Sequence, residues 1–336
     1  MSQGAWLVTG ASGFLGRHLL TELETGSEPR QTLALVRSED EWRKLDWTCS
    51  LLSTGTLTGS VTDTTAWSKD PRLDDLAGIF HLAALVRHCR RDGAEVLDTN
   101  VRGTVAMVRL AAERKCRMVF VSTSGTVGCF RDPEGTADED SPFCEAVVSG
   151  WPYYRSKIEA EREARRLADQ LGVSLVIVRP PVLLGPGDHR FRSTNHVSRF
   201  LRGKLPFLVR GGMHFADVRD AARALAAAMG REQPRPVYHL PGTASSIEEF
   251  FAGTARIAGR KPPRLVLPYR AAWWLARLGA PLGLLPDPVI VEMAAHYWGM
   301  TSRYAECDLG YRSRPPEDTL TDTVAWLMAH HPALAP

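Results

Sequence analysis

Short apolar runs alternate with amphipathic stretches through the first half of the chain. The runs are rich in Val, Leu and Ile and predict buried strands at residues 5–9, 33–37, 79–82, 118–122 and 175–178. The stretches between them carry apolar residues at helical spacing and predict helices at residues 13–24, 101–113 and 154–171. Such alternation implies a parallel sheet with helices on both faces. We therefore expect an α/β fold, a Rossmann-like doubly wound parallel sheet.

The pattern changes after residue 179. Residues 180–187 hold three prolines and two glycines, and residues 190–214 are rich in Arg and Gly. Apolar periodicity then predicts a strand at residues 237–240 and helices at residues 216–229, 247–258, 271–278, 289–297 and 317–330. We expect a smaller, helix-rich C-terminal lobe whose segments interleave with the sheet.

Composition excludes several classes of protein. The 336 residues carry 41 Lys+Arg and 38 Asp+Glu, so the net charge is +3 and no nucleic-acid footprint is expected. No run of about 18 uncharged apolar residues predicts a transmembrane helix. A signal peptide is not expected, because a strand and a glycine loop occupy residues 5–16. The six cysteines lack metal-ligand spacing, so we expect no metal site and reduced thiols in a cytoplasmic protein.

A glycine triplet follows the first predicted strand and opens the first predicted helix. In this context Gly10 permits a tight turn, Gly13 lets the backbone approach a pyrophosphate, and Gly16 lets helix and strand pack closely. The alternative is a glycine turn that binds no ligand. The strand–loop–helix context favours a dinucleotide site.

The end of the second strand bears on the choice of cofactor. A free ribose 2′-hydroxyl is usually held by an acid about twenty residues after the glycine loop. Arg37 stands there instead, which favours a 2′-phosphate and so NADP over NAD, with Lys44 as a second positive charge. The alternative is a solvated surface arginine, since Glu39 and Asp40 lie nearby.

A Tyr-x-x-x-Lys motif begins the long helix. The spacing places Tyr153 and Lys157 on one helical face, one turn apart. An ammonium beside a phenol stabilises the phenolate and lowers its pKa, which suits the phenol to acid–base catalysis. The alternative is a surface tyrosine beside a solvated lysine.

Hydroxyl side chains gather where the 118–122 strand ends. Ser122, Thr123, Ser124 and Thr126 stand at the carboxyl end of a strand, where open α/β sheets place their ligands. One of them is a candidate to hold a substrate carbonyl. The alternative is a polar strand end whose hydroxyls cap turns.

Taken together, these motifs resemble those of a known superfamily. The glycine loop, His81-Leu82-Ala83-Ala84, Asn100-Val101-Arg102-Gly103-Thr104, the hydroxyl segment, Tyr153/Lys157 and the segment from Arg179 to Asp188 occur in order. The chain thereby resembles the extended short-chain dehydrogenase/reductases, also called the NAD-dependent epimerase/dehydratase superfamily. Within it, Arg37 and residues 211–220 look most like the dihydroflavonol reductase and 3β-hydroxysteroid dehydrogenase branch.

The resemblance implies roles for individual residues. Tyr153 is the acid–base, Lys157 its partner and a contact of the nicotinamide ribose, and Thr123 the active hydroxyl, with Ser124 as the neighbouring alternative. The residues implied to bind the cofactor are Gly10, Ser12, Gly13, Phe14, Leu15, Gly16, Arg37, Ala83, Lys157, Pro180 and Val182. Residues 1–180, with 216–240 returning to them, form the implied NAD(P)-binding domain, and residues 181–336 the substrate lobe.

Other residues keep two interpretations. His81 is expected to pack beside the cofactor rather than to titrate, and Asn100 either joins a water relay or caps a helix start. The variable-lobe arginines either grip an anionic group of the substrate or line a solvated face; they are Arg190, Arg192, Arg199, Arg202 and Arg210. Trp273-Trp274 is expected to pack the small lobe, although residues 271–285 could also touch a membrane.

Three functions follow from the resemblance. The leading one is an NADP-dependent oxidoreductase that interconverts a carbonyl and an alcohol on a small organic substrate, with Tyr153 as acid–base. A nucleotide-sugar epimerase or dehydratase is the second, but Ser124-Gly125 stands where dehydratases carry an acidic pair. A non-catalytic NADP-sensing regulator is the third, and the intact Tyr/Lys pair counts against it. Related enzymes often dimerise through the helices at 101–113 and 154–171, which leaves a homodimer open.

Overall fold

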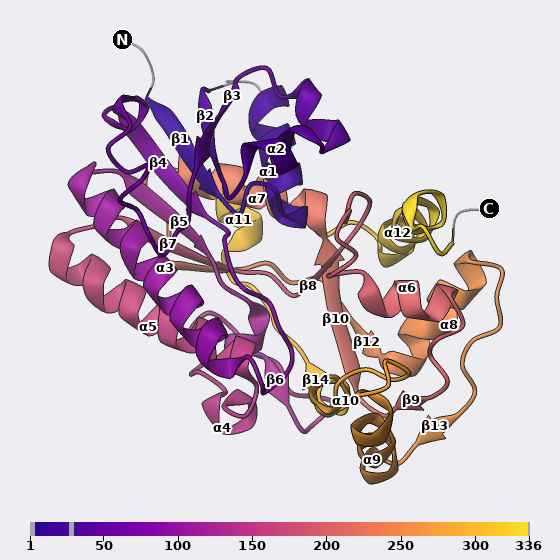
Figure 1. The fold of residues 1–336 in the computed structure, drawn as a ribbon. Helices are drawn as coiled ribbons and strands as arrows, with labels where there is room; N and C mark the ends of the chain where they lie inside the picture. The colour runs from indigo at the N-terminus through magenta and orange to yellow at the C-terminus, as the bar shows by residue number, and fades with distance from the viewer. Residues whose placement is uncertain (1–3, 27–29, 335–336) are drawn as a thin grey trace.

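A seven-stranded parallel sheet forms the centre of the larger part of the molecule. The computed structural model describes residues 4–26 and 30–334 (Figure 1). The sheet order is β11-β7-β5-β4-β1-β2-β3, and every neighbouring pair runs parallel. The strands are β1 (Ala5–Thr9), β2 (Thr32–Val36), β3 (Thr54–Thr58), β4 (Leu76–His81), β5 (Arg117–Val121), β7 (Leu175–Arg179) and β11 (Val237–His239). The predicted doubly wound α/β fold is confirmed.

Helices cover both faces of this sheet. α1 (Phe14–Thr25) and α7 (Val218–Gly230) pack on one face, and α3 (Gly93–Glu113) and α5 (Pro152–Leu171) on the other. The chain winds from β1 outward to β3 and then returns to β4 on the opposite side of β1. Strand order therefore reverses between β1 and β4, and the carboxyl ends of these strands open a crevice where such sheets bind ligands.

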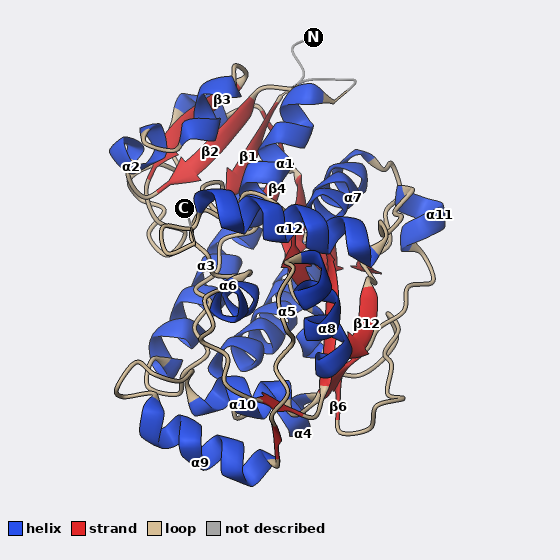
Figure 2. Cartoon of the chain, turned by 90° about the vertical axis from the view of Figure 1, so that its right-hand side faces the viewer, coloured by secondary structure: helices blue, strands red, loops and turns tan. Residues whose placement is uncertain are grey.

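A smaller lobe, rich in helices, lies beyond the carboxyl ends of the strands (Figures 1 and 2). Its own core joins α6, α8 and α12 through side chains such as Phe200, Phe250 and Val324. Its sheet has the order β12-β10-β8. The elements of the lobe are β8 (Val182–Leu184), α6 (Asn195–Leu201), β9 (Leu208–Val209), β10 (Gly212–Asp217), β12 (Thr243–Ser246), α8 (Ile247–Ile257), β13 (Val266–Leu267), α9 (Tyr269–Gly279), α10 (Pro288–Ala294) and α12 (Pro316–His330).

Short elements complete the chain. They are α2 (Glu39–Arg43), β6 (Cys129–Phe130), α4 (Glu145–Val148), β14 (Tyr297–Trp298) and α11 (Ala305–Leu309). β6 pairs with β14, so the segment after the hydroxyl turn contacts the C-terminal third of the chain. No helix among the described residues is long and apolar enough to cross a membrane.

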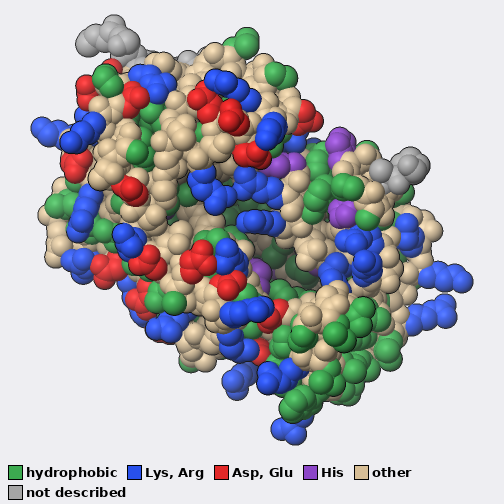
Figure 3. Space-filling model, in the orientation of Figure 1, with side chains coloured by type: hydrophobic (Ala, Val, Ile, Leu, Met, Phe, Trp, Pro, Cys, Tyr) green, Lys and Arg blue, Asp and Glu red, His purple; other side chains and the backbone are tan. Residues whose placement is uncertain are grey.

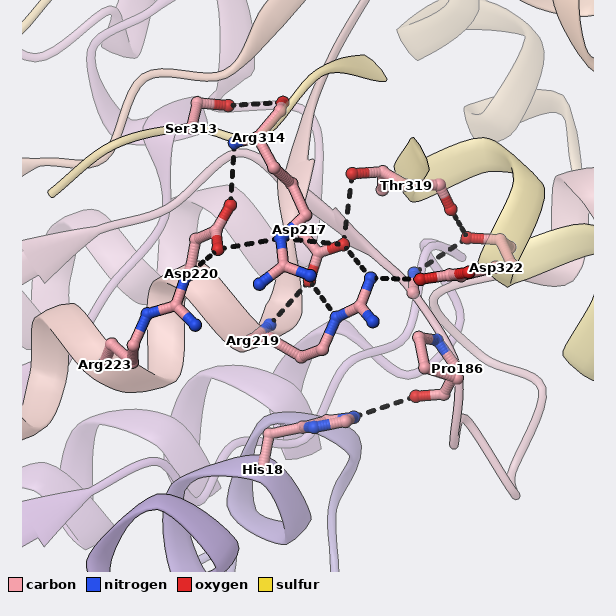
Figure 4. Close-up of polar contacts among 12 residues, drawn as sticks. His18, Pro186, Asp217, Arg219, Asp220, Arg223, Ser313, Arg314, Thr319 and Asp322 are labelled. Carbon is pink, nitrogen blue, oxygen red and sulfur yellow. Dashed lines mark hydrogen bonds and ion pairs between the residues drawn. The ribbon is translucent and has the colours of Figure 1, made fainter. Parts of the chain in front are cut away.

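A polar seam ties the end of β10 and α7 to the last helix (Figure 4). Buried Asp217 accepts hydrogen bonds from Arg219 Nε at 2.9 Å and from Thr319 Oγ1 at 3.1 Å. Arg219 also pairs with Asp322 of α12 at 2.6 Å. On α1, His18 Nε2 lies 2.8 Å from the carbonyl oxygen of Pro186. These contacts fix the lobe against the sheet on the side of the glycine loop.

Two predicted helices differ from those observed. α3 starts at Gly93 rather than residue 101, because the fully buried Val96 secures its first two turns, in which Gly93, Asp98 and Thr99 are weak helix formers. The predicted helix at 289–297 ends at Ala294, and Tyr297 pairs with Phe130 instead. In both places contacts with distant segments outweigh local propensity.

Candidate active site

The glycine loop has the shape of an anion cradle. Gly10 adopts a φ of +70°, and a Cβ there would lie 2.7 Å from the backbone nitrogen of Ala83. A Cβ on Gly16 would lie 2.3 Å from the Gly10 carbonyl oxygen, so glycine is required for this close approach. Gly13 caps α1 without a side-chain hydrogen bond, which leaves the amides of the first turn without a side-chain acceptor. The residues present therefore fit a dinucleotide pyrophosphate.

Basic side chains from both parts of the molecule gather beside this cradle. Arg37 is exposed directly after β2, while Arg190 of the smaller lobe donates from Nη2 to the Ser12 hydroxyl at 3.0 Å. The pKa of Arg190 is lowered, first by burial and then by repulsion from Arg192 and Arg37. Asp188, the nearby carboxylate, is occupied by the backbone nitrogen and hydroxyl of Thr194. Figure 3 shows basic side chains gathered around the hollow between the two parts.

Lys44 does not join this cluster. Its Nζ pairs with Glu41 at 2.6 Å on the exposed face of α2. The positive charges that lie near Arg37 in the structure are those of Arg190 and Arg192, which the sequence assigned to the substrate or to a solvated face. The spacing of residues in the sequence could not reveal that Arg190 lies near Arg37, because the two residues are far apart in the chain and come together only when it folds.

The other predicted cofactor contacts line the same crevice. Ala83 donates its backbone N–H to Thr9 Oγ1 at 3.2 Å, directly across from Gly10. The carbonyl of Pro180 accepts from the backbone N–H of Ser124 at 2.8 Å, and Val182 opens β8 just beyond. Phe14 and Leu15 are half-buried in the first turn of α1.

The hydroxyl segment forms a tight turn after β5. Thr123 is half-buried, and its Oγ1 accepts a long hydrogen bond of 3.3 Å from the backbone nitrogen of Gly125. Ser124 is more deeply buried, with 6% of its surface exposed. The greater exposure of Thr123 favours it over Ser124 as the hydroxyl that a substrate reaches.

The first turn of α5 packs directly on this hydroxyl turn. A Cβ on Gly125 would lie 2.0 Å from the Tyr154 ring, so glycine makes room for this side chain. Tyr153 meets His88 edge-on with ring centroids 5.5 Å apart. Burial raises the pKa of Tyr153 to about 12. The phenol is therefore firmly protonated, opposite to the lowered pKa expected from the motif.

Lys157 is bound away from the phenol in this structure. Its Nζ donates to the carbonyl oxygen of Val121 at 2.6 Å and lies 4.3 Å from the centroid of the Phe120 ring. Burial lowers the pKa of Lys157 to about 7, although the charge of Glu161 opposes that shift. Lys157 thus joins α5 to the end of β5 through this hydrogen bond.

A buried ion pair supports the hydroxyl turn from behind. Glu161 accepts from Arg179 Nη2 at 2.6 Å and Nε at 3.0 Å, and both side chains are enclosed. The same carboxylate accepts from Ser122 Oγ and, at 3.2 Å, from Thr126 Oγ1. Sequence reasoning missed Glu161, although its position one turn after Lys157 on the same face was a usable signal.

Two further expected residues have structural partners. His81 is buried with Nδ1 2.8 Å from Thr9 Oγ1 and Nε2 3.2 Å from Thr104 Oγ1, and burial lowers its pKa to about 3. This buried, hydrogen-bonded environment agrees with the expected packing role of His81 rather than with a titrating one. Asn100 lies within α3, where its side chain bonds the backbone of Leu85 and the hydroxyl of Ser156, so the helix-cap interpretation is wrong.

His88 is a site residue that the sequence did not reveal. Its Nδ1 is buried without a hydrogen-bond partner among the described residues, and burial lowers the pKa of its ring to about 4. A neutral imidazole beside Tyr153 can donate or accept one hydrogen bond. The candidate site thus offers a phenol and an imidazole in contact with each other on α5 and the segment after β4, with the Thr123 hydroxyl in the turn on which α5 packs.

Comparison with known proteins agrees with this geometry. Residues 6–240 match the family described as the NAD dependent epimerase/dehydratase family. A protein of Synechocystis sp. named "Putative dihydroflavonol 4-reductase" is 28% identical over 340 residues, covering 97% of this chain and 95% of that protein.

Solved structures share the fold across nearly the whole chain. The crystal structure of gox2253 superposes with a TM-score of 0.82 at 28% identity, covering 97% of this chain and 98% of that one. UDP-glucuronic acid 4-epimerase from Bacillus cereus, in complex with NAD, has a TM-score of 0.74 at 18% identity and covers 98% of both chains. The latter likeness concerns the fold alone.

Proposed function

Because this chain belongs to the NAD-dependent epimerase/dehydratase family and is an enzyme of the extended short-chain dehydrogenase/reductase type, we propose that it is an NADP-dependent carbonyl reductase. It interconverts a carbonyl and an alcohol on a small organic substrate. The observation that carries the proposal is that the helix bearing Tyr153 packs on the Thr123 turn at the carboxyl end of β5, through the Tyr154 ring against Gly125 and through Lys157 Nζ on the Val121 carbonyl. The relative named as a dihydroflavonol 4-reductase supports carbonyl chemistry.

In this proposal the two parts of the chain bind different molecules. Residues 1–180, with 216–240, hold the cofactor, and residues 181–336 form most of the substrate lobe. The carboxyl-end crevice between them holds the reacting groups. A homodimer through α3 and α5 and a cytoplasmic location belong to the same proposal and rest on the family resemblance.

The cofactor site follows from the residues described above. The Gly10–Gly16 loop holds the pyrophosphate, and Arg37 with Arg190 and Arg192 holds the 2′-phosphate. Ala83, Pro180, Val182 and Lys157 line the remainder of the crevice. When bound, the nicotinamide supplies or accepts a hydride at the substrate carbon.

Proton transfer is assigned to Tyr153. A phenol whose pKa is raised to about 12 by burial carries its proton at neutral pH, so it is ready to donate to a developing alkoxide. Thr123 Oγ1 donates a hydrogen bond to the same substrate oxygen and polarises the carbonyl.

A substrate panel tests the proposed reaction. Carbonyl compounds, hydroxysteroids and nucleotide sugars are incubated with reduced or oxidised cofactor, and the absorbance of the reduced nicotinamide is followed. We expect net cofactor oxidation with at least one carbonyl compound. Tight binding of UDP or TDP, without net change in the cofactor, would instead establish a nucleotide-sugar epimerase or dehydratase.

Removal of Arg37 is expected to reduce the preference for NADP. A charged hydrogen bond to phosphate contributes enough that Arg37→Ala should weaken NADP binding by about tenfold to a hundredfold and leave NAD binding nearly unchanged. The matched control is Arg43→Ala, which removes an exposed arginine paired with Glu39 on α2. Dissociation constants for both cofactors, measured by fluorescence titration, decide the matter. An unchanged NADP-to-NAD ratio in Arg37→Ala contradicts the 2′-phosphate assignment.

A further inference from the structure

Helix α9 presents its large apolar side chains to solvent. Its buried positions are the small residues Ala272, Ala276 and Gly279. On the opposite side Trp274 is 59% exposed and Leu278 69% exposed. An amphipathic helix of a globular protein normally buries its bulky side chains. α9 therefore buries its small side chains and exposes its large apolar ones, which are available to a partner.

The exposed apolar surface extends beyond the helix. Leu282 and Leu284 follow α9 and are 73% and 66% exposed, and Leu265 lies in the segment before it. We call this surface the α9 patch, made up of Leu265, Val266, Tyr269, Trp274, Leu275, Leu278, Leu282 and Leu284. Figure 3 shows a broad apolar surface at the lower right, where Figure 1 places α9 and β13. Contiguous patches of this kind mark interaction sites.

The charges in the segment that carries the patch have one sign. Residues 251–286 contain no Asp or Glu. The same stretch places five exposed cations beside the patch, namely Arg260, Lys261, Arg264, Arg270 and Arg277. Trp, Leu and Arg side chains combined in this way suit a lipid headgroup region, where arginine stems cover apolar surface and their charges meet phosphates.

We propose that the α9 patch docks on the surface of a bilayer that contains anionic lipids. α9 has 11 residues, so it lies in the plane of the interface and does not span the membrane. A second copy of the chain fits less well, because a two-fold contact between identical patches would bring their arginines together with no acid in the segment to compensate. Charge complementarity thus selects the anionic membrane as the occupant.

The docking helix is firmly mounted on the rest of the molecule. Trp273 Nε1 donates to Glu292 Oε1 at 2.8 Å, and Trp151 Nε1 donates to Glu292 Oε2 at 2.9 Å. Arg90 completes the set with an ion pair of 2.6 Å to the same carboxylate. Trp151 immediately precedes α5, so one buried carboxylate joins the docking helix to the helix that carries Tyr153.

Vesicle co-sedimentation tests the proposal with the full chain. We expect binding to vesicles of phosphatidylcholine with phosphatidylglycerol, weak binding to phosphatidylcholine alone, and a loss of binding as salt rises. The double variant Trp274→Ala/Leu278→Ser should weaken binding by about tenfold or more. Arg270→Gln and Arg277→Gln should each weaken it by about fivefold. The control is Leu52→Ser, which removes an equally large, 89% exposed leucine far along the chain from the patch.

Each other outcome overturns the proposal. Binding that is absent from both vesicle types, or unchanged in the patch variants, shows that the patch does not contact lipid. Light scattering on the same samples measures the molar mass and so detects a second copy of the chain bound at the patch. If the native chain is a dimer without vesicle binding, and Trp274→Ala/Leu278→Ser makes it a monomer, the patch is an interface between copies. Unchanged NADP affinity in the variants shows that they remain folded.

Discussion

Replacing Tyr153 by phenylalanine is expected to lower turnover on the true substrate by about a hundredfold to ten-thousandfold. The change removes the proton donor and keeps the aromatic ring that packs edge-on against His88. NADP affinity should stay nearly unchanged, because the residues proposed to hold the phosphates of the cofactor lie in the glycine loop and in the arginine cluster. Turnover on the best substrate of the panel and cofactor binding by fluorescence are the two measurements.

Tyr154 supplies a matched control for this variant. Its ring is buried against Gly125 and Trp298, and burial raises its pKa well above the usual value. Tyr154→Phe therefore also removes one hydroxyl from the same turn of α5, and we expect it to retain most of the activity. Full turnover in Tyr153→Phe refutes the acid–base assignment, and a loss confined to Tyr154→Phe moves that role to the neighbouring residue.

The sheet was predictable because its strands are locally unambiguous. Segments such as β7 and β5 are nearly continuous runs of Val, Leu, Ile and Phe, which only a strand buried on both faces requires. β3 was missed because Thr54–Thr58 contains one leucine among threonines and a glycine. Its place in the sheet is set by pairing with β2, which no local pattern records.

The sequence predicts the local geometry of the candidate site where its residues lie close together in the chain. The glycine loop and the Tyr153–Lys157 turn are short motifs, and the spacing alone fixes which side chains share a face. Three other contacts join segments that are far apart in the sequence. They are the hydrogen bond from Arg190 to Ser12, the hydrogen bond from Lys157 to the Val121 carbonyl and the ring contact between His88 and Tyr153. The direction of the Tyr153 pKa shift was wrong for the same reason, since burial depends on the whole fold.

The buried Glu161–Arg179 pair also makes the hydroxyl turn sensitive to acid. Burial by itself raises the pKa of Glu161, but Arg179 and the Ser122 hydroxyl together hold that pKa below its ordinary value. The unfolded chain has a glutamate pKa of about 4.3. The contribution of Glu161 to stability is therefore present above that pH and is lost as pH falls through the lower folded-state pKa. Glu161→Gln should lose a smaller share of its stability on acidification.

Replacing Glu161 by leucine is expected to destabilise the protein by about 3–5 kcal/mol. The change leaves the Arg179 guanidinium buried without its carboxylate and deprives Ser122 and Thr126 of an acceptor. Urea unfolding followed by circular dichroism measures the loss. Glu161→Leu/Arg179→Met is the control, because removing both charges should restore much of the stability that removing one destroys.

Activity separates the structural part of this effect from its consequence for catalysis. The double variant keeps Tyr153, Lys157 and the glycine loop, but the turn that carries Thr123 has lost the carboxylate that held it. We therefore expect a folded protein that binds NADP normally and turns over substrate at least about tenfold more slowly. If the double variant is as active as the native enzyme, Glu161 serves stability alone and Thr123 is held by other contacts.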